Sequence, residues 1–109
     1  MVGKIEVIYT PSVISYLNDL VIILYKKEYF GFIEFADEYV DDIYDAIPER
    51  IKKSPHKKTP KPLQYLGSNY IFYNTSSRTT WYIFFEKRDQ NYLITGITNN
   101  HCIEAKELW

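Results

Sequence analysis

Two side chains that could act on a phosphate ester stand at the ends of an apolar stretch. Arg78 precedes the first of two strand-like runs, and His101 follows the second. The planar guanidinium of arginine suits bidentate contact with phosphate, and an unperturbed histidine, with a pKa of ~6.5, can transfer protons near neutrality. The alternatives are a strand-start arginine paired with a surface acid and an exposed loop histidine without a role.

The spacing of Arg78 and His101 makes a geometric prediction. In adjacent antiparallel strands, the start of one lies beside the end of the next. We therefore expect Arg78 and His101 to be neighbours at one end of a hairpin. A site built from them fails if they lie at opposite ends or faces of the sheet.

A basic segment precedes these runs. Residues 50–61 carry six basic and no acidic side chains, and residues 28–49 carry eight acidic and no basic ones, although the net charge is −1. Lys57, Lys58 and Lys61 could hold an RNA backbone, because each phosphate contact adds salt-sensitive affinity; alternatively they only solubilise a loop. RNA binding further requires that the acidic segment face away from the RNA.

Tyr82 and the acidic segment have two interpretations each. Tyr82, in the first strand-like run, could stack on a base or donate a proton, or it could pack within the sheet. The acids of residues 34–45 predict a solvated helix face rather than a metal cluster, because they spread along a surface instead of converging. We expect no metal and no other cofactor.

Length and composition predict one domain. A chain of 109 residues buries roughly two thirds of its unfolded surface, so residues 1–109 can form a single domain with its own core. The single Cys102 cannot form an intramolecular disulfide, which fits a reducing compartment. Residues 20–24, the only run resembling a signal-peptide core, are short and far below the ~20 residues of a membrane span. We expect a soluble, cytoplasmic protein.

Hydrophobic periodicity predicts a strand and then a helix at the N-terminus. Ile5, Val7 and Tyr9 alternate with Lys4, Glu6 and Ile8, which is typical of a strand with one better-buried face. Thr10 and Pro11 read as an N-cap followed by proline in the first turn. Apolar side chains then follow the three- and four-residue spacing of one helix face as far as Leu24.

A second helix is predicted after Gly31. Its acidic side chains point outward, and Pro48 ends or kinks it. The apolar side chains predicted to point inward are Phe32, Ile33, Phe35, Ala36, Tyr39, Val40, Ile43, Tyr44 and Ile47.

The second half of the chain is predicted to be a connection and three strands. Residues 52–62 hold three prolines and five lysines, and are expected to be extended and exposed. Residues 70–73, 80–85 and 92–98 are rich in aromatic and β-branched side chains and are separated by turn-forming residues, which predicts a three-stranded antiparallel meander.

These elements predict an α+β fold of order β-α-α-β-β-β, namely an N-terminal strand, a two-helix hairpin and a three-stranded antiparallel meander. Two helices packed on one sheet face bury the apolar surface economically, and the first strand can join the later three. The other face stays at least partly open. Trp81, Ile83 and Phe85 share one face, so Tyr82 and Phe84 are expected to form an aromatic platform on the other.

The order of elements resembles the RelE/ParE superfamily of bacterial toxins from toxin-antitoxin pairs. The similarity covers nearly the whole chain as architecture. It is sharper over residues 78–85, RTTWYIFF, and residues 97–101, ITNNH, which are similar to a RelE-like subgroup. The resemblance implies a single RelE/ParE-like domain over residues 1–109.

The resemblance also implies an activity and roles for residues. RelE-type toxins enter the decoding site of the ribosome and cut mRNA, with the 2′-OH attacking the neighbouring phosphate. By position, Arg78 and His101 resemble the catalytic strand residues of the family. Lys57, Lys58 and Lys61 resemble its linker lysines. This chemistry needs proton donors, proton acceptors and cations to stabilise the phosphorane, but no metal.

Two further functions remain open alongside the nuclease. ParE-like members act through protein contacts on DNA gyrase, and an inactive member of the fold would only bind another protein. In either toxin reading, the expected partner is a cognate antitoxin that wraps the helices or covers the basic end. The ribosome and mRNA are expected partners of a nuclease, and a membrane is not.

Overall fold

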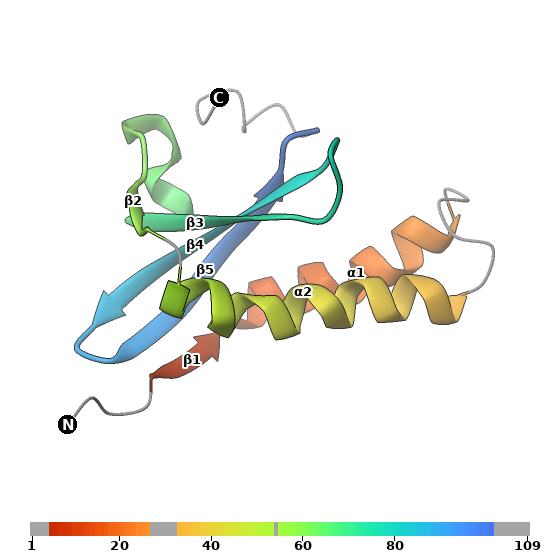
Figure 1. Cartoon of the computed structure of the whole chain (residues 1–109), viewed down its shortest axis with the longest axis horizontal. Coiled ribbons are helices and arrows are strands. Elements are labelled where there is room, and N and C mark those ends of the chain that lie inside the picture. The colour runs from red at the N-terminus through yellow and green to blue at the C-terminus, as the bar shows by residue number, and fades with distance from the viewer. Residues whose placement is uncertain (1–4, 27–32, 54, 102–109) are drawn as a thin grey trace.

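The architecture comes from a computed structural model that describes residues 5–26, 33–53 and 55–101. The elements in chain order are β1 (Glu6–Tyr9), α1 (Pro11–Lys26), α2 (Ile33–Lys53), β2 (Lys57–Lys58), the 3-10 helix η1 (Lys61–Leu66), β3 (Asn69–Asn74), β4 (Thr80–Arg88) and β5 (Asn91–Asn99), as Figure 1 shows.

One mixed sheet of five strands organises the chain. Its order is β1-β5-β4-β3-β2. Strands β3, β4 and β5 form the predicted antiparallel meander, and β1 joins them by running parallel to β5. The α+β class is therefore confirmed. The prediction of a purely three-stranded antiparallel meander is wrong, because β1 makes the sheet mixed and β2 adds an edge strand next to β3.

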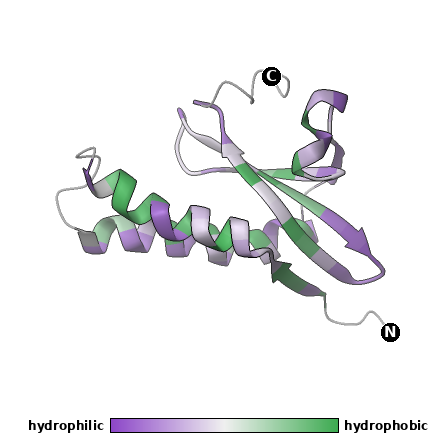
Figure 2. Ribbon diagram, turned by 180° about the vertical axis from the view of Figure 1, so that it is seen from behind, coloured by the Kyte–Doolittle hydropathy of each residue, from purple (hydrophilic) through white to green (hydrophobic). Residues whose placement is uncertain are grey.

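Both helices pack on one face of this sheet, as predicted. Thr10 caps α1, since its Oγ1 accepts a hydrogen bond from Val13 N at 3.4 Å. The helices run side by side in Figure 1, and hydrophilic and hydrophobic residues alternate along α2 in Figure 2. The buried core cluster between the layers is Val13, Leu17, Leu20, Val40, Ile43, Ile47, Ile51, Ile71, Trp81, Ile83, Phe85, Tyr92, Ile94 and Ile97.

Helix α2 differs from its prediction in two places. It continues through Pro48 to Lys53. Ile47 and Ile51 are both buried, and burying two such side chains, at about 1.5–3 kcal/mol each, offsets the ~3 kcal/mol cost of an internal proline. Phe35 was expected to point inward but is 51% exposed. Phe32 lies outside the described residues.

The predicted extended linker is also partly wrong. Residues 52–53 end α2 and residues 61–66 form η1, so these parts are not extended, whereas residues 57–58 are extended and exposed as the edge strand β2. Leu63 and Leu66 of η1 pack against Tyr70 and Phe84 on the sheet face opposite the helices. Phe84 is consequently buried beneath η1 rather than part of an open platform, whereas Tyr82 is only half-buried.

No helix of the described part of the chain is both long and apolar enough to cross a membrane.

Stability should fall in alkali because four tyrosines have raised pKa values. Burial raises the pKa of Tyr9, Tyr44, Tyr70 and Tyr82 above 10.0, and for Tyr9 the charges of Tyr44 and Asp45 add to burial. The folded chain then holds these protons more tightly than the unfolded chain. The stability they contribute is complete below pH ~10 and is lost as the pH rises through the folded pKa.

Urea unfolding at about pH 8 and pH 10.5 measures this loss. Tyr9→Phe should show a smaller fall than the unsubstituted protein. Equal falls in the two proteins would contradict a contribution from Tyr9.

Candidate functional site

Arg78 and His101 meet at one end of the β4–β5 hairpin. Asn100 Nδ2 donates a hydrogen bond to the Arg78 carbonyl at 2.9 Å, and His101 Nε2 lies 3.2 Å from Thr79 Oγ1. Thr80 N donates to Asn100 Oδ1, and Asn100 N donates to Thr80 O, both at 3.0 Å. The prediction that the two ends of this segment are neighbours is confirmed.

Hydrogen bonds hold the loop that carries Arg78. Thr75 N donates to Thr79 O at 3.1 Å, and Arg78 N donates to Ser76 Oγ at 3.2 Å. Thr75 Oγ1 also shares a 2.9 Å hydrogen bond with the Tyr39 hydroxyl of α2. The backbone around Arg78 is thus defined by its own turn and by the helix layer.

The two candidate side chains are exposed and carry no acidic partner in the described residues. Arg78 is exposed, and no carboxylate within residues 5–26, 33–53 and 55–101 pairs with it. The alternative of a surface ion pair therefore finds no support among those residues. His101 is exposed too, and the Thr79 hydroxyl orients its ring.

The three candidate lysines lie at different distances from this end. Lys57 pairs with Tyr70, four residues along β3 from Asn74, which pairs with Thr80 at the hairpin end. At about 3.3 Å per residue, that separation is roughly 13 Å. Lys58 pairs with Asn69, one residue farther away, and Lys61 begins η1. All three are exposed.

A groove of about 310 Å³ connects Lys57 to the hairpin end on the sheet face opposite the helices. Its lining residues are Lys57, Tyr70, Phe72, Asn74, Thr80 and Tyr82. The structure thus brings Tyr82 and Lys57 together, and leaves Lys58 and Lys61 outside the groove. A concave surface with aromatic rings and a few polar groups is the usual form of a small-ligand site.

Arg50 adds a cation at the edge of β3 beside this groove. Its guanidinium lies 5.8 Å from the centroid of the Phe72 ring, and Nε donates a hydrogen bond to Phe72 O at 3.2 Å. The last turn of α2 places it there. Arg50 therefore brings positive charge from the helix layer to the side of the groove.

The acidic face of α2 points away from the groove. The side chains at positions 34, 37, 38, 41, 42 and 45 are all exposed, and α2 packs on the sheet face opposite Tyr82. The acidic side chains of α2 therefore face away from the groove, which is the arrangement that RNA binding requires.

His56 has a structural position. Its Nε2 lies 2.8 Å from Ile51 O near the end of α2, and its ring packs edge-on against Phe85 and Tyr92 at 5.1 and 5.7 Å. The ring satisfies a carbonyl that the helix leaves unpaired.

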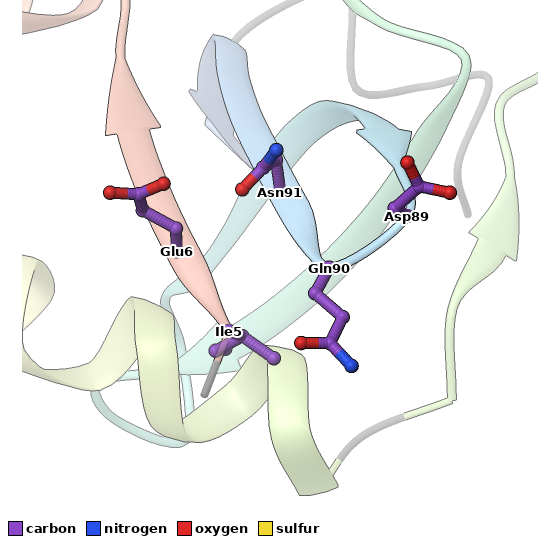
Figure 3. Close-up of a pocket in the computed structure, with 5 residues that line it drawn as sticks. All are labelled: Ile5, Glu6, Asp89, Gln90 and Asn91. Atoms are coloured by element: carbon purple, nitrogen blue, oxygen red, sulfur yellow. The ribbon is translucent and has the colours of Figure 1, made fainter. Parts of the chain in front are cut away.

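A second hollow lies at the other end of the hairpin. It measures about 620 Å³, and Figure 3 shows its lining residues Ile5, Glu6, Asp89, Gln90 and Asn91, which come from the start of β1 and from the β4–β5 turn. Among the described residues, two carboxylates and no basic side chain line it, which does not suit an anionic ligand. The smaller groove is lined instead by the basic side chain of Lys57.

No group of three or more His, Cys, Asp or Glu side chains within the described ranges is arranged to hold a metal ion. Comparisons of the chain with protein-family models, curated proteins and solved structures found no match.

Sequence reasoning missed most of the groove. Tyr70, Phe72 and Thr80 looked like ordinary strand residues, Asn74 was assigned to the turn after residues 70–73, and Arg50 counted only toward the basic segment. The available signal was the alternation of Tyr70, Phe72 and Asn74, which places all three on one face of β3. The cross-strand partners that complete the groove follow from the register and not from local sequence.

Proposed function

We propose that this protein is a RelE-type toxin that cuts mRNA on the ribosome. The observation that carries the proposal is the junction of Arg78 and His101 at the hairpin end, next to a groove that contains Lys57 and Tyr82. A cation and a proton-transfer group at one hairpin end, with an aromatic groove nearby, are parts that RNA cleavage needs. The resemblance of residues 78–85 and 97–101 points to the same activity.

In the proposed reaction, the ribose 2′-oxygen attacks the adjacent phosphorus and the bond to the 5′-oxygen breaks. His101 accepts the 2′-hydroxyl proton or donates a proton to the leaving 5′-oxygen, and a second group or water completes the transfer. Arg78 stabilises the charge of the phosphorane. The products are a 2′,3′-cyclic phosphate and a 5′-hydroxyl.

The lysines and Arg50 would bind the RNA backbone. Lys57 lies closest, while Lys58 and Lys61 extend the basic surface toward η1. An antitoxin would neutralise the protein by covering this basic end or by wrapping the helices. The proposed location is the cytoplasm, where the ribosome is.

A cell-free translation reaction tests the proposal. We expect the protein to cleave a reporter mRNA within its reading frame and to leave 5′-hydroxyl ends, which primer extension and end-specific ligation detect. The same mRNA without a start codon is the matched control and should stay intact. An intact translated message would reject the nuclease function, and inhibition of gyrase supercoiling with an intact message would favour the ParE-like alternative.

A further inference from the structure

The groove presents hydrogen-bond donors in a fixed arrangement. Thr80 Oγ1 donates a hydrogen bond to Asn74 Oδ1 at 2.6 Å, and both side chains line the groove. Because the amide oxygen is held by Thr80, the amide is oriented with Nδ2 and its two hydrogens left for a ligand. Lys57 Nζ adds three further donors.

The tyrosines of the groove also act as donors at neutral pH. Burial raises the pKa of Tyr70, and burial together with Tyr70 raises the pKa of Tyr82. Both hydroxyls therefore keep their protons. The two rings meet edge to face with centroids 6.1 Å apart, which limits their movement.

Phe72 and Tyr82 provide the apolar surface for stacking. Both are half-buried, so part of each ring is accessible from the groove. The volume of about 310 Å³ is at the small end of ligand sites. It suits one unstacked base, with Lys57 placed to contact a neighbouring phosphate.

We propose that this groove binds a single RNA base and prefers the keto bases guanine and uracil over the amino bases adenine and cytosine. Guanine offers O6 and N7, and uracil offers O4, as acceptors for Asn74 Nδ2 and its neighbours. Adenine and cytosine place an amino donor there, which would face the donors of the groove. The choice of RNA as ligand rests on the proposed function, and the base preference rests on Asn74 and Thr80.

Binding of uncleavable oligonucleotides without ribosomes tests this preference. The probes are four fluorescein-labelled 2′-O-methyl tetranucleotides that carry one base, G, U, A or C, and are otherwise abasic. Fluorescence anisotropy should give dissociation constants about fivefold lower for G and U than for A and C, as expected for one net hydrogen bond. Equal constants, a preference for A and C, or no saturable binding would overturn the proposal.

Substitutions separate base reading from stacking and charge. Thr80→Val should abolish the preference because the Asn74 amide is no longer oriented, and Asn74→Ala, at an exposed position, should do the same without touching the strand core. Phe72→Ala should weaken all four probes by about tenfold. Lys57→Ala should lower the slope of log affinity against log salt by about 0.7.

Two variants outside the groove serve as controls. Tyr65→Ala removes a ring of η1 that is 71% exposed, and Lys26→Ala removes one positive charge at the end of α1. Both should bind the probes as the unsubstituted protein does. A preference that survives in Thr80→Val and Asn74→Ala would overturn the role of the amide.

The outcomes also distinguish this inference from the nuclease function. If the protein prefers keto bases but leaves translated mRNA intact, the base preference of the groove is supported and the nuclease function is rejected. If the protein cleaves mRNA but binds all four probes equally, the nuclease function is supported and the base preference is rejected.

Discussion

Replacement of His101 by alanine should lower mRNA cleavage by about 10²- to 10⁴-fold, which is the usual contribution of one positioned acid or base. The ring lies at the end of β5, and Thr79 Oγ1 orients it next to the Arg78 backbone. Alanine removes the proton-transfer group without disturbing the core, because His101 is exposed. Quantitative primer extension on a translated reporter measures the loss.

The other histidine provides the matched control. His56→Ala removes an imidazole that packs on Phe85 and donates a hydrogen bond to Ile51 O at the end of α2. The His56→Ala variant should cleave mRNA as fast as the unsubstituted protein at equal concentrations of folded protein, and its free energy of unfolding should be slightly lower. If the two alanine variants cleave equally, His101 is not a catalytic residue.

Arg78 is expected to contribute by charge and by shape. Arg78→Ala should reduce cleavage by about 10²- to 10³-fold, as the loss of one stabilising donor does at other charged transition states. Arg78→Lys keeps the charge but loses the planar fork, and should recover only part of the activity. If Arg78→Ala cleaves mRNA as fast as the unsubstituted protein, the guanidinium of Arg78 takes no part in the reaction.

Replacement of Gly67 by alanine should destabilise the fold by about 3 kcal/mol. Gly67 has a φ of 153°, and an added Cβ would lie 2.6 Å from Thr95 Oγ1, 2.9 Å from Phe84 Cβ and 2.9 Å from Phe85 N. Backbone of a buried strand cannot move away at low cost. Thr95 Oγ1 would also lose its 2.6 Å hydrogen bond to Leu66 O, which ties η1 to the sheet.

Urea unfolding of Gly67→Ala measures this cost, and Ser68→Ala is its neighbour control. Ser68 is exposed, and its hydrogen bonds with Glu86 Oε2 and Thr59 N use only the backbone atoms of Ser68, so its alanine variant should stay within about 0.5 kcal/mol of the unsubstituted protein. An unchanged free energy of unfolding in Gly67→Ala would mean that η1 does not pack on the sheet as described.

The regular elements of this fold were predictable because their signals are local. The alternation of Ile5, Val7 and Tyr9 predicted β1, and Thr10 with Pro11 predicted the start of α1. The parallel pairing of β1 with β5 was not predictable, because it depends on a partner over eighty residues away. The two-residue strand β2 is too short to show any period.

The departures at Pro48 and η1 have a common cause. Local propensity predicted a helix end or kink at Pro48 and an extended linker after it, but buried apolar side chains continue the helix past Pro48 and fold η1: Ile47 and Ile51 in α2, and Leu63 in η1. Leu63 and Leu66 lie three residues apart, which is the period of a 3-10 helix, and this was the available signal.

The sequence indicated Arg78 and His101 as candidate residues, but it did not indicate the groove residues of β3. Arg78 and His101 stood out because charged and polar side chains border apolar strands. Phe72 and Asn74 did not, because an aromatic side chain in a strand and an asparagine at a strand end are ordinary until the register places them opposite Tyr82 and Thr80.

Tyr39 links the site to the opposite layer of the protein. Its hydroxyl accepts a 2.9 Å hydrogen bond from Trp81 Nε1 and shares another with Thr75 Oγ1. The Arg78 loop and the tryptophan at the start of β4 thus share one anchor on α2. A binding partner that shifted α2 by a fraction of a turn would break both bonds and detach the Arg78 loop from the helix layer, so a ligand of the helix side could alter this loop without occupying the groove.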